Sequence, residues 1–461
     1  MHTIKNRVDE FIANPRRALF VLAAPVAIAM FVQTMYNIVD TAFVGRLGAA
    51  SIAALTFAFP IFFILISLNS GLGVGINSII SRLLGAKNKE AAENAAAHGI
   101  IMTAVFAVAV YFLGRLMLRP LYSLFGATQD VRALSMSYMT IILLAVFFMF
   151  PAYAMNSIFA AQGDTRTPMV VQTFGFVLNA ILDPIFIYLL RFGVRGAAIA
   201  TDIAIAVTLL VYIYFLKKRS YLRVRLRHFR FSFDLCREIC RVGAPASLMM
   251  LTMSVYVMFL NRFMAHFGTV YVASFGLATR LESLVSLPIF ALSISLLTLV
   301  GMFYGAKRYD LVKSISWYGI EIGVAAAGAV GVLFYVFPIV FLKIFTQDRL
   351  ILMIGSAYLR VDVLTFPTMA IAMILSRVLQ GMGFGFPGFF INAIRIFLVA
   401  VPLAYVFVFV LGYGFLSIAW AMVAGGVTAS ILAFWWMGIK FRGLSGASQI
   451  SGMVFEAKQK S

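Results

Sequence analysis

The tripeptide Gly85-Ala86-Lys87 recurs as Gly305-Ala306-Lys307, 220 residues further along the chain (305 − 85 = 220). Other matches share this offset: Ala24-Pro25 with Ala244-Pro245, Gly48 with Gly268, and Gly99-Ile100 with Gly319-Ile320. Further along, the offsets drift between 216 and 219: Phe150-Pro151 with Phe366-Pro367, Gln162-Gly163 with Gln380-Gly381, and Gly193 with Gly412. Because glycines and prolines match in the same order, the sequence predicts one structural unit that occurs twice.

The composition indicates a protein embedded in a membrane. Of 461 residues, 62% are hydrophobic and only 12% are charged, and a soluble surface needs more charge than that. A helix needs about 20 apolar residues to cross the hydrocarbon core. Hydrophobic runs and helix breakers predict twelve such segments, at 17–44, 51–80, 92–117, 131–155, 168–190, 196–217, 241–265, 270–300, 313–341, 353–379, 387–411 and 416–438.

Six predicted segments lie in each copy of the repeat. An even number returns the chain to its starting side, so the copies are parallel repeats. We therefore expect an all-α integral membrane fold with twelve transmembrane helices. The predicted parts are an N-terminal lobe at 1–217, a basic linker at 218–240, a C-terminal lobe at 241–438 and a tail at 439–461.

The net charge of +20 is concentrated on one side of this arrangement. Lysines and arginines fill the linker, precede the first segment and follow the second and eighth. The positive-inside rule then places both termini and the linker in the cytoplasm. The prediction is a multi-pass protein of the cytoplasmic membrane whose partner is the lipid bilayer, and no nucleic-acid binding is expected.

Three motifs resemble those of the multidrug and toxic compound extrusion (MATE) family. They are Asp40-Thr41-Ala42-Phe43-Val44-Gly45-Arg46-Leu47-Gly48, Gln162-Gly163-Asp164-Thr165-Arg166-Thr167-Pro168 and Gly196-Ala197-Ala198-Ile199-Ala200-Thr201. The resemblance covers essentially the whole chain. It implies a V-shaped two-lobe transporter with a central cleft, a monomer, and cation-coupled export of drugs. The aspartates of the first and fifth helices resemble those of the family's DNA-damage-inducible branch.

Two acids stand inside apolar helices of the first copy only. Asp40 falls opposite Leu260 at the repeat offset, and Tyr36 and Asn37 precede it on the same helical face. Asp183 lies deep in an apolar run. Asn179 shares the face of Asp183, and Pro184 follows it directly and disfavours α geometry there. An intramembrane acid is a functional candidate because burying a charge in lipid is costly.

Depth estimates along the helices bring these acids together. At 1.5 Å per residue, the outer half of the first lobe gathers a candidate ion-coupling set of Asp40, Asp183, Asn179 and Thr201, supported by Tyr36, Asn37 and Tyr138. Asn156 joins this set only if its helix is kinked at Pro151. The alternative interpretation is a polar network that only holds the helices together.

The pair of acids suggests how transport is driven. Burial favours the protonated form of a carboxyl group, and neighbouring carboxyl groups titrate as a pair. A bound H⁺ or Na⁺ relieves their repulsion and lets the lobe repack, with Pro25 and Pro184 as the sites where the helices bend. No cofactor and no metal other than Na⁺ is expected, and the choice between H⁺ and Na⁺ stays open.

The second copy offers Glu282 as its acid within a helix. Pairing with Arg262 is one interpretation, and an acidic contact for a cationic substrate is the other. Arg395 is predicted to be a lone cation that caps carbonyls or extends its charge toward the interface.

The function predicted from the sequence is a multidrug efflux antiporter that exports cationic or amphipathic compounds in exchange for H⁺ or Na⁺. The alternative is a flippase for lipid-linked glycans or other lipids, which would need several basic side chains within the helices. An enzyme is not expected, because the four histidines are scattered and form no ligand spacing.

Overall fold

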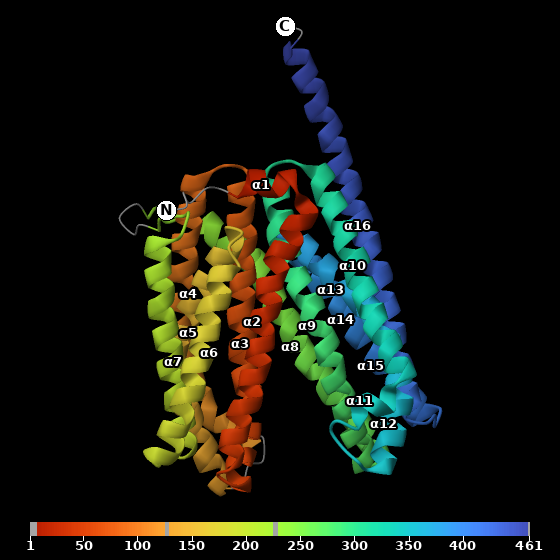
Figure 1. Ribbon diagram of the computed structural model, residues 1–461. Helices are drawn as coiled ribbons and strands as arrows, with labels where there is room; N and C mark the ends of the chain where they lie inside the picture. Colours follow the sequence, from red (N-terminus) through yellow and green to blue (C-terminus); the bar gives the residue numbers. More distant parts are fainter. Residues whose placement is uncertain (1–6, 125–128, 225–228, 460–461) are drawn as a thin grey trace. The chain divides into compact units, whose positions relative to one another are not determined.

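The computed structural model describes residues 7–124, 129–224 and 229–459, without the side chains of 49–50, 52–53, 123–124, 129–131 and 444–459. All regular elements in these ranges are helices (Figure 1). The first half contains α1 (Val8–Ala13), α2 (Pro15–Gly45), α3 (Ala49–Gly85), α4 (Lys89–Leu124), α5 (Gln129–Ala161), α6 (Arg166–Pro184), η1 (Ile185–Leu189) and α7 (Val194–Lys218).

The second half contains α8 (Phe233–Phe267), α9 (Thr269–Gly305), α10 (Tyr309–Val336), α11 (Pro338–Leu342), α12 (Arg349–Asp362), α13 (Thr365–Gly381), α14 (Phe386–Ala393), η3 (Ile394–Ala400), α15 (Val401–Tyr405), η4 (Val406–Val410) and α16 (Leu416–Gln459). Among the described residues, 11 spans are long and apolar enough to cross a membrane, and α12 with α13 makes a twelfth that is bent by 50°. The predicted all-α fold with twelve spans is therefore confirmed.

The bend between α12 and α13 has a local cause. Pro367 has no N–H to donate to the carbonyl of Val363, four residues earlier, and its ring crowds that carbonyl. The interruption lies just ahead of this proline, at Val363 and Leu364. Thr365 Oγ1 donates to the carbonyl oxygen of Asp362 at 2.7 Å, which satisfies one backbone group at the break. At the repeat-equivalent Pro151, α5 stays one helix.

The chain forms two compact units. Unit 1 comprises residues 1–9 and Ala24–Ser247, and unit 2 comprises Glu10–Ala23 and residues 248–461. The division falls inside α2 and α8, whereas the predicted lobes are divided at the linker. The first turns of α2 pack with α10, where Arg16 lies 4.8 Å from the centre of the Tyr318 ring. The first turns of α8 pack with α3, where Arg82 and Glu238 form an ion pair of 2.9 Å.

Close packing in unit 1 depends on glycines in the middle of α3. A Cβ atom on Gly71 would overlap Ser247 Oγ of α8, and one on Gly73 would overlap the Tyr153 ring of α5. Both helices approach α3 because no side chain keeps them away, as in other small-residue helix interfaces within membranes.

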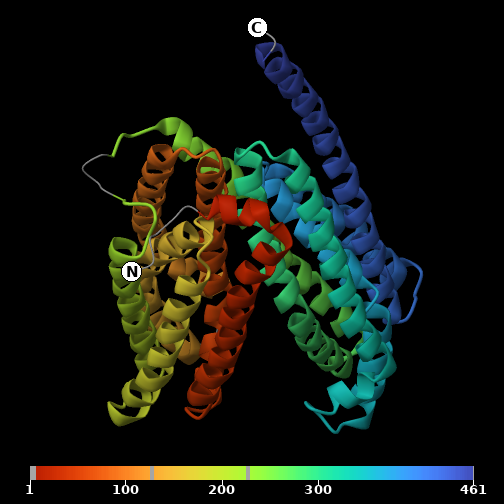
Figure 2. The same ribbon diagram turned by 45° about the horizontal axis from the view of Figure 1, so that its top comes forward.

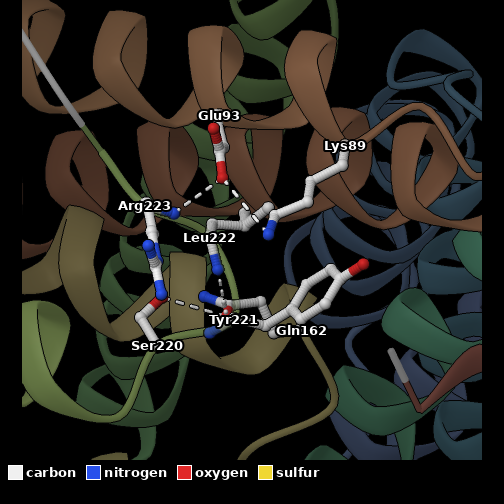
Figure 3. A network of polar contacts seen from close by, with 7 residues as sticks. All are labelled: Lys89, Glu93, Gln162, Ser220, Tyr221, Leu222 and Arg223. Atoms are coloured by element: carbon white, nitrogen blue, oxygen red, sulfur yellow. Dashed lines mark hydrogen bonds and ion pairs between the residues drawn. The ribbon is translucent and has the colours of Figure 1, made fainter. Parts of the chain in front are cut away.

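The described parts of the linker, residues 219–224 after α7 and 229–232 before α8, lie at one end of unit 1 (Figure 2). Figure 3 shows its first part held by Gln162, whose Oε1 accepts from Ser220 Oγ at 3.0 Å, Tyr221 N at 2.8 Å and Leu222 N at 3.2 Å. Beside it, Glu93 Oε1 accepts from the backbone N–H of Arg223 at 2.8 Å. The first part of the basic linker is therefore fastened to unit 1 by the buried Gln162 and the partly exposed Glu93.

The second part of the linker is held by α4. Asn94 exchanges hydrogen bonds with the backbone of Arg230, at 3.0 and 3.3 Å. The backbone N–H of Ser232 donates to Nε2 of His98 at 2.9 Å, so Nδ1 carries the ring proton and donates to the Asn94 carbonyl at 2.8 Å. His98 is 1% exposed, which makes it a structural histidine that positions the start of α8.

Candidate ion-coupling site in unit 1

Asp183 lies near the end of α6 and is completely buried. Its Oδ1 accepts from Nδ2 of Asn179, one helical turn earlier, at 2.8 Å. Its Oδ2 is buried and has no hydrogen-bond donor among the described residues. A buried carboxylate oxygen without a donor is unfavourable, so this position calls for a proton or another cation.

Pro184 changes how the helix continues. The sequence predicts a departure from α geometry at Asp183, but Asp183 and Pro184 both belong to α6. The change comes one residue later, where the chain winds into the π-helix η1. Because proline has no N–H, the carbonyl four residues before it loses its helical partner. Short π-helical turns of this kind are frequent at functional sites.

Asn179 connects three helices. Its Oδ1 accepts a hydrogen bond from the hydroxyl of Tyr36 on α2. Thr201 Oγ1 on α7 lies 3.5 Å from the same oxygen and donates to the Ala197 carbonyl at 3.0 Å. The Tyr36 ring stacks on Phe176 of α6, with ring centres 5.2 Å apart. The amide oxygen of Asn179 therefore accepts from Tyr36 and has the Thr201 hydroxyl beside it.

Asp40 follows Tyr36 by one turn of α2 and is half-buried. Its carboxyl group lies within hydrogen-bonding reach of the Asp183 carboxyl. Tyr138 of α5 interacts electrostatically with both acids and with Tyr36. The structure thus brings together Asp40, Asp183, Asn179, Thr201, Tyr36 and Tyr138, all from the predicted set. Two carboxyl groups at this separation share a proton or bind a cation, because two adjacent buried negative charges repel each other.

Two predicted members lie elsewhere. Asn37 is exposed on α2. Asn156 lies 18 residues beyond Tyr138 on the continuous helix α5, which places it about 27 Å away along the axis. α5 runs through Pro151 as one helix, so Asn156 does not share the depth of Tyr138. Pro25 lies inside α2, next to the division between the units, and its role in bending stays a prediction.

Two side chains near the site were not predicted to belong to it. Asp202 follows Thr201 on α7 and interacts electrostatically with Tyr138, and its Oδ1 is buried without a partner among the described residues. The hydroxyl of Tyr188 in η1 donates to the Phe43 carbonyl at 2.5 Å, which ties the end of α2 to η1. The sequence feature that could have predicted this role of Tyr188 is a tyrosine within an otherwise apolar run.

Unit 2 corrects the expectations for Glu282 and Arg395. Glu282 is half-buried on α9, and the cation that acts on it is Arg395 of η3. Arg262 is exposed, so the predicted Arg262–Glu282 pair is wrong. Arg395 is likewise no lone cation, because it interacts with both Glu282 and Asp362.

Comparison with known proteins agrees with this architecture. The sequence model of the family described as MatE matches the chain twice, at residues 25–185 and 245–406. The chain belongs to the MATE family. The two matches start 220 residues apart (245 − 25 = 220), the same offset that separates Gly85-Ala86-Lys87 from Gly305-Ala306-Lys307.

Individual relatives support the assignment over the full length of this MATE protein. Probable multidrug resistance protein YoeA of Bacillus subtilis is 27% identical over 399 residues, covering 85% of this chain and 86% of the relative. The FAD transporter of Shewanella oneidensis is 26% identical over 411 residues, covering 87% and 90%. A crystal structure of MATE in the bent conformation is 31% identical and covers 97% of this chain and 100% of its own, with a TM-score of 0.93.

Proposed function

We propose that the protein is a multidrug efflux antiporter that exchanges a cationic or amphipathic compound for H⁺ or Na⁺ at Asp40 and Asp183. The observation that carries this proposal is the meeting of two carboxyl groups from α2 and α6 at a site where one oxygen is buried without a donor. Among the described residues, no positively charged group acts on either carboxyl. Charge balance therefore depends on cations that come and go.

The hydrogen bonds around Asn179 support a proton as the ion bound in this state. Sodium needs several oxygen ligands, and the Asn179 oxygen already accepts from Tyr36 and lies beside Thr201. A sodium ion bound at the side of Asn179 that faces Tyr36 would displace the Tyr36 hydroxyl, whereas a proton fits between the carboxyl groups without displacing any group. Sodium then competes for the same acids after Tyr36 moves.

The remaining parts of the proposal follow from the charge distribution and the family. We propose that the protein works as a monomer in the cytoplasmic membrane, with both termini in the cytoplasm and without a cofactor. Cationic cargo suits a site whose charges are carboxylates. The FAD transporter among the relatives is a reason to include flavin nucleotides in the substrate panel. The lipid flippase stays the alternative that the following experiment separates.

The test is dye efflux from proteoliposomes under an imposed pH or sodium gradient. A cationic dye such as ethidium is loaded, and wild type is compared with Asp183→Asn. We expect gradient-driven efflux by wild type and a fall to the level of protein-free liposomes in the variant. Asp310→Asn is the matched control, because Asp310 is exposed beside Arg308, at 2.8 Å.

Two results would overturn the proposal. One is efflux by Asp183→Asn at the wild-type rate under the same gradient. The other is a folded wild-type protein that moves no cationic dye under either gradient, which would place lipid-flipping assays first.

A further inference from the structure

Unit 2 contains a buried polar cluster that the first unit does not share. Tyr256 of α8 and Tyr358 of α12 are 2% and 1% exposed, and Asp362 at the end of α12 is fully buried. Glu282 of α9 and Arg395 of η3 complete it, and both are half-buried. We call these five residues the unit 2 cluster. They come from four helices and include two acids and one permanent cation.

The cluster is held together by electrostatics and ring contacts more than by tight hydrogen bonds. The Arg395 guanidinium lies 5.7 Å from the centre of the Tyr256 ring, a distance at which a cation is attracted to the ring face. It also acts on both Glu282 and Asp362. Thr365 Oγ1 lies 3.5 Å from Asp362 Oδ1, and the opposite oxygen has no partner in the described part of the chain.

The internal repeat shows what Arg395 replaces. Tyr256 is the repeat mate of Tyr36 at the offset of 220. Pro168 with Pro387 and Gly193 with Gly412 fix the offset at 219 between them, so Arg395 is the mate of Phe176. In unit 1 the Phe176 ring stacks on Tyr36 at 5.2 Å. In unit 2 a guanidinium group lies against the equivalent tyrosine ring instead.

The ion-coupling positions themselves are apolar in unit 2. At the same offsets, the mates of Asp40, Asn179, Asp183 and Thr201 are Leu260, Leu398, Pro402 and Trp420. None of these four side chains can bind a cation through an oxygen. The acids of unit 2 therefore stand at different positions, and they occur together with an arginine.

The two units differ in how their buried charge is balanced. A net charge is costly to hold in a low-dielectric interior unless it is paired. The unit 1 acids face no described cation, so they need exchangeable ones. In unit 2, Arg395 supplies one positive charge that acts on the carboxyl groups of both Glu282 and Asp362. Arginine does not lose its proton in proteins, so this positive charge stays in place throughout a transport cycle.

We propose that Arg395 is a built-in counter-ion that fixes the charge of the unit 2 cluster, so that only unit 1 exchanges cations. This proposal takes the role of unit 1 from the proposed function, whereas the role of Arg395 in unit 2 is argued from the unit 2 cluster. Arg395 acts as a specificity-determining residue, because it keeps a second acid pair from responding to H⁺ or Na⁺.

The other groups that pack around the cluster do not supply this charge. Tyr358 donates to the sulfur of Met422 on α16 at 3.1 Å, and Thr365 begins α13. Arg280 on α9 and Glu321 on α10 are exposed. Within the described residues, Arg395 is the cation that acts on both acids.

Tryptophan fluorescence can test the proposal, because the tryptophans of the chain lie in one unit. All four tryptophans, Trp317, Trp420, Trp435 and Trp436, lie in unit 2. Trp420 is two residues from Met422, which contacts the cluster through Tyr358. Tryptophan emission therefore reports on unit 2. The measurements use purified full-length protein carrying Asp40→Asn and Asp183→Asn, which silences unit 1 whether or not unit 1 couples transport.

In this background, emission is recorded while Na⁺ replaces choline at constant ionic strength, at a series of pH values between roughly 6 and 8, the range over which histidine and perturbed groups titrate. We expect no Na⁺-dependent or pH-dependent shift while Arg395 is present. Adding Arg395→Gln should create a saturable shift, and adding Asp362→Asn to that variant should abolish it. Arg280→Gln is the matched control and should create none.

A second substitution keeps the test valid if Arg395→Gln does not fold. Arg395→His retains a cation at acidic pH and loses it as the pH rises past the usual imidazole range of about 6.5. It should create the response only on the alkaline side. The proposal is overturned if unit 2 responds to Na⁺ with Arg395 in place, or if folded Arg395→Gln or Arg395→His adds no response. Efflux by Asp183→Asn at the wild-type rate would instead overturn the proposed function.

Discussion

Replacing Gln162 with leucine should release the linker from unit 1. The side-chain oxygen of Gln162 accepts from Ser220 Oγ, Tyr221 N and Leu222 N, and its amide donates to the Ile158 carbonyl at 3.0 Å. Ser220 and Leu222 are 7% and 0% exposed. Each buried donor left without a partner costs about 1–3 kcal/mol. With two such donors, the substitution should lower the free energy of opening the linker segment by at least about 2 kcal/mol.

Limited proteolysis measures this local stability directly. Arg219 and Arg223 are trypsin sites in the linker segment that Gln162 holds, and cleavage requires this segment to open. A loss of about 2 kcal/mol raises the open population about 30-fold, since 1.4 kcal/mol is a factor of ten. Gln380→Leu is the matched control, because this repeat mate accepts from Arg377 at 2.9 Å and does not hold the linker. A folded Gln162→Leu protein cleaved within twofold of the wild-type rate would refute the argument.

Two further predictions concern packing and the site. Gly71→Val should prevent recovery of monodisperse protein in size-exclusion chromatography, because a Cβ atom there overlaps Ser247 and overpacking costs about 1–3 kcal/mol even where neighbours can shift. The control Gly276→Ala, with open space around the glycine, should behave as wild type. Equal recovery of both variants would contradict this prediction. Asn179→Leu should abolish gradient-driven dye efflux and lower the thermal midpoint, because it leaves a hydroxyl and a carboxylate unpaired at about 1–3 kcal/mol each; retained efflux would show that the amide is dispensable.

The repeat and the spans were predictable because they depend on patterns of apolar residues, glycine and proline along the chain. Six of the predicted site residues lie together for a related reason. Depth in a membrane follows from counting along a helix, and the i, i+4 spacing of Tyr36 with Asp40 and of Asn179 with Asp183 fixes a shared face.

What the sequence could not provide was the rotation of each helix about its axis. Thr201 was predicted to face the site and its neighbour Asp202 was not included, yet both interact with site residues. Arg395 shows the same difficulty in a stronger form. It lies in the π-helix η3, where an extra residue per turn shifts every later side chain from the face that a 3.6-residue period predicts.

The pair Tyr36 and Tyr256 shows how duplication separates frame from chemistry. The repeat keeps the tyrosine in both units. In each unit a side chain from another helix covers the tyrosine ring, Phe176 in unit 1 and Arg395 in unit 2. Replacing a phenyl ring by a guanidinium group at that one position adds a charge that never dissociates. A pair of acids beside that charge needs one cation fewer from solution than a pair without it. One position in the repeat can therefore change how many external cations a unit needs, even though both units have the same fold.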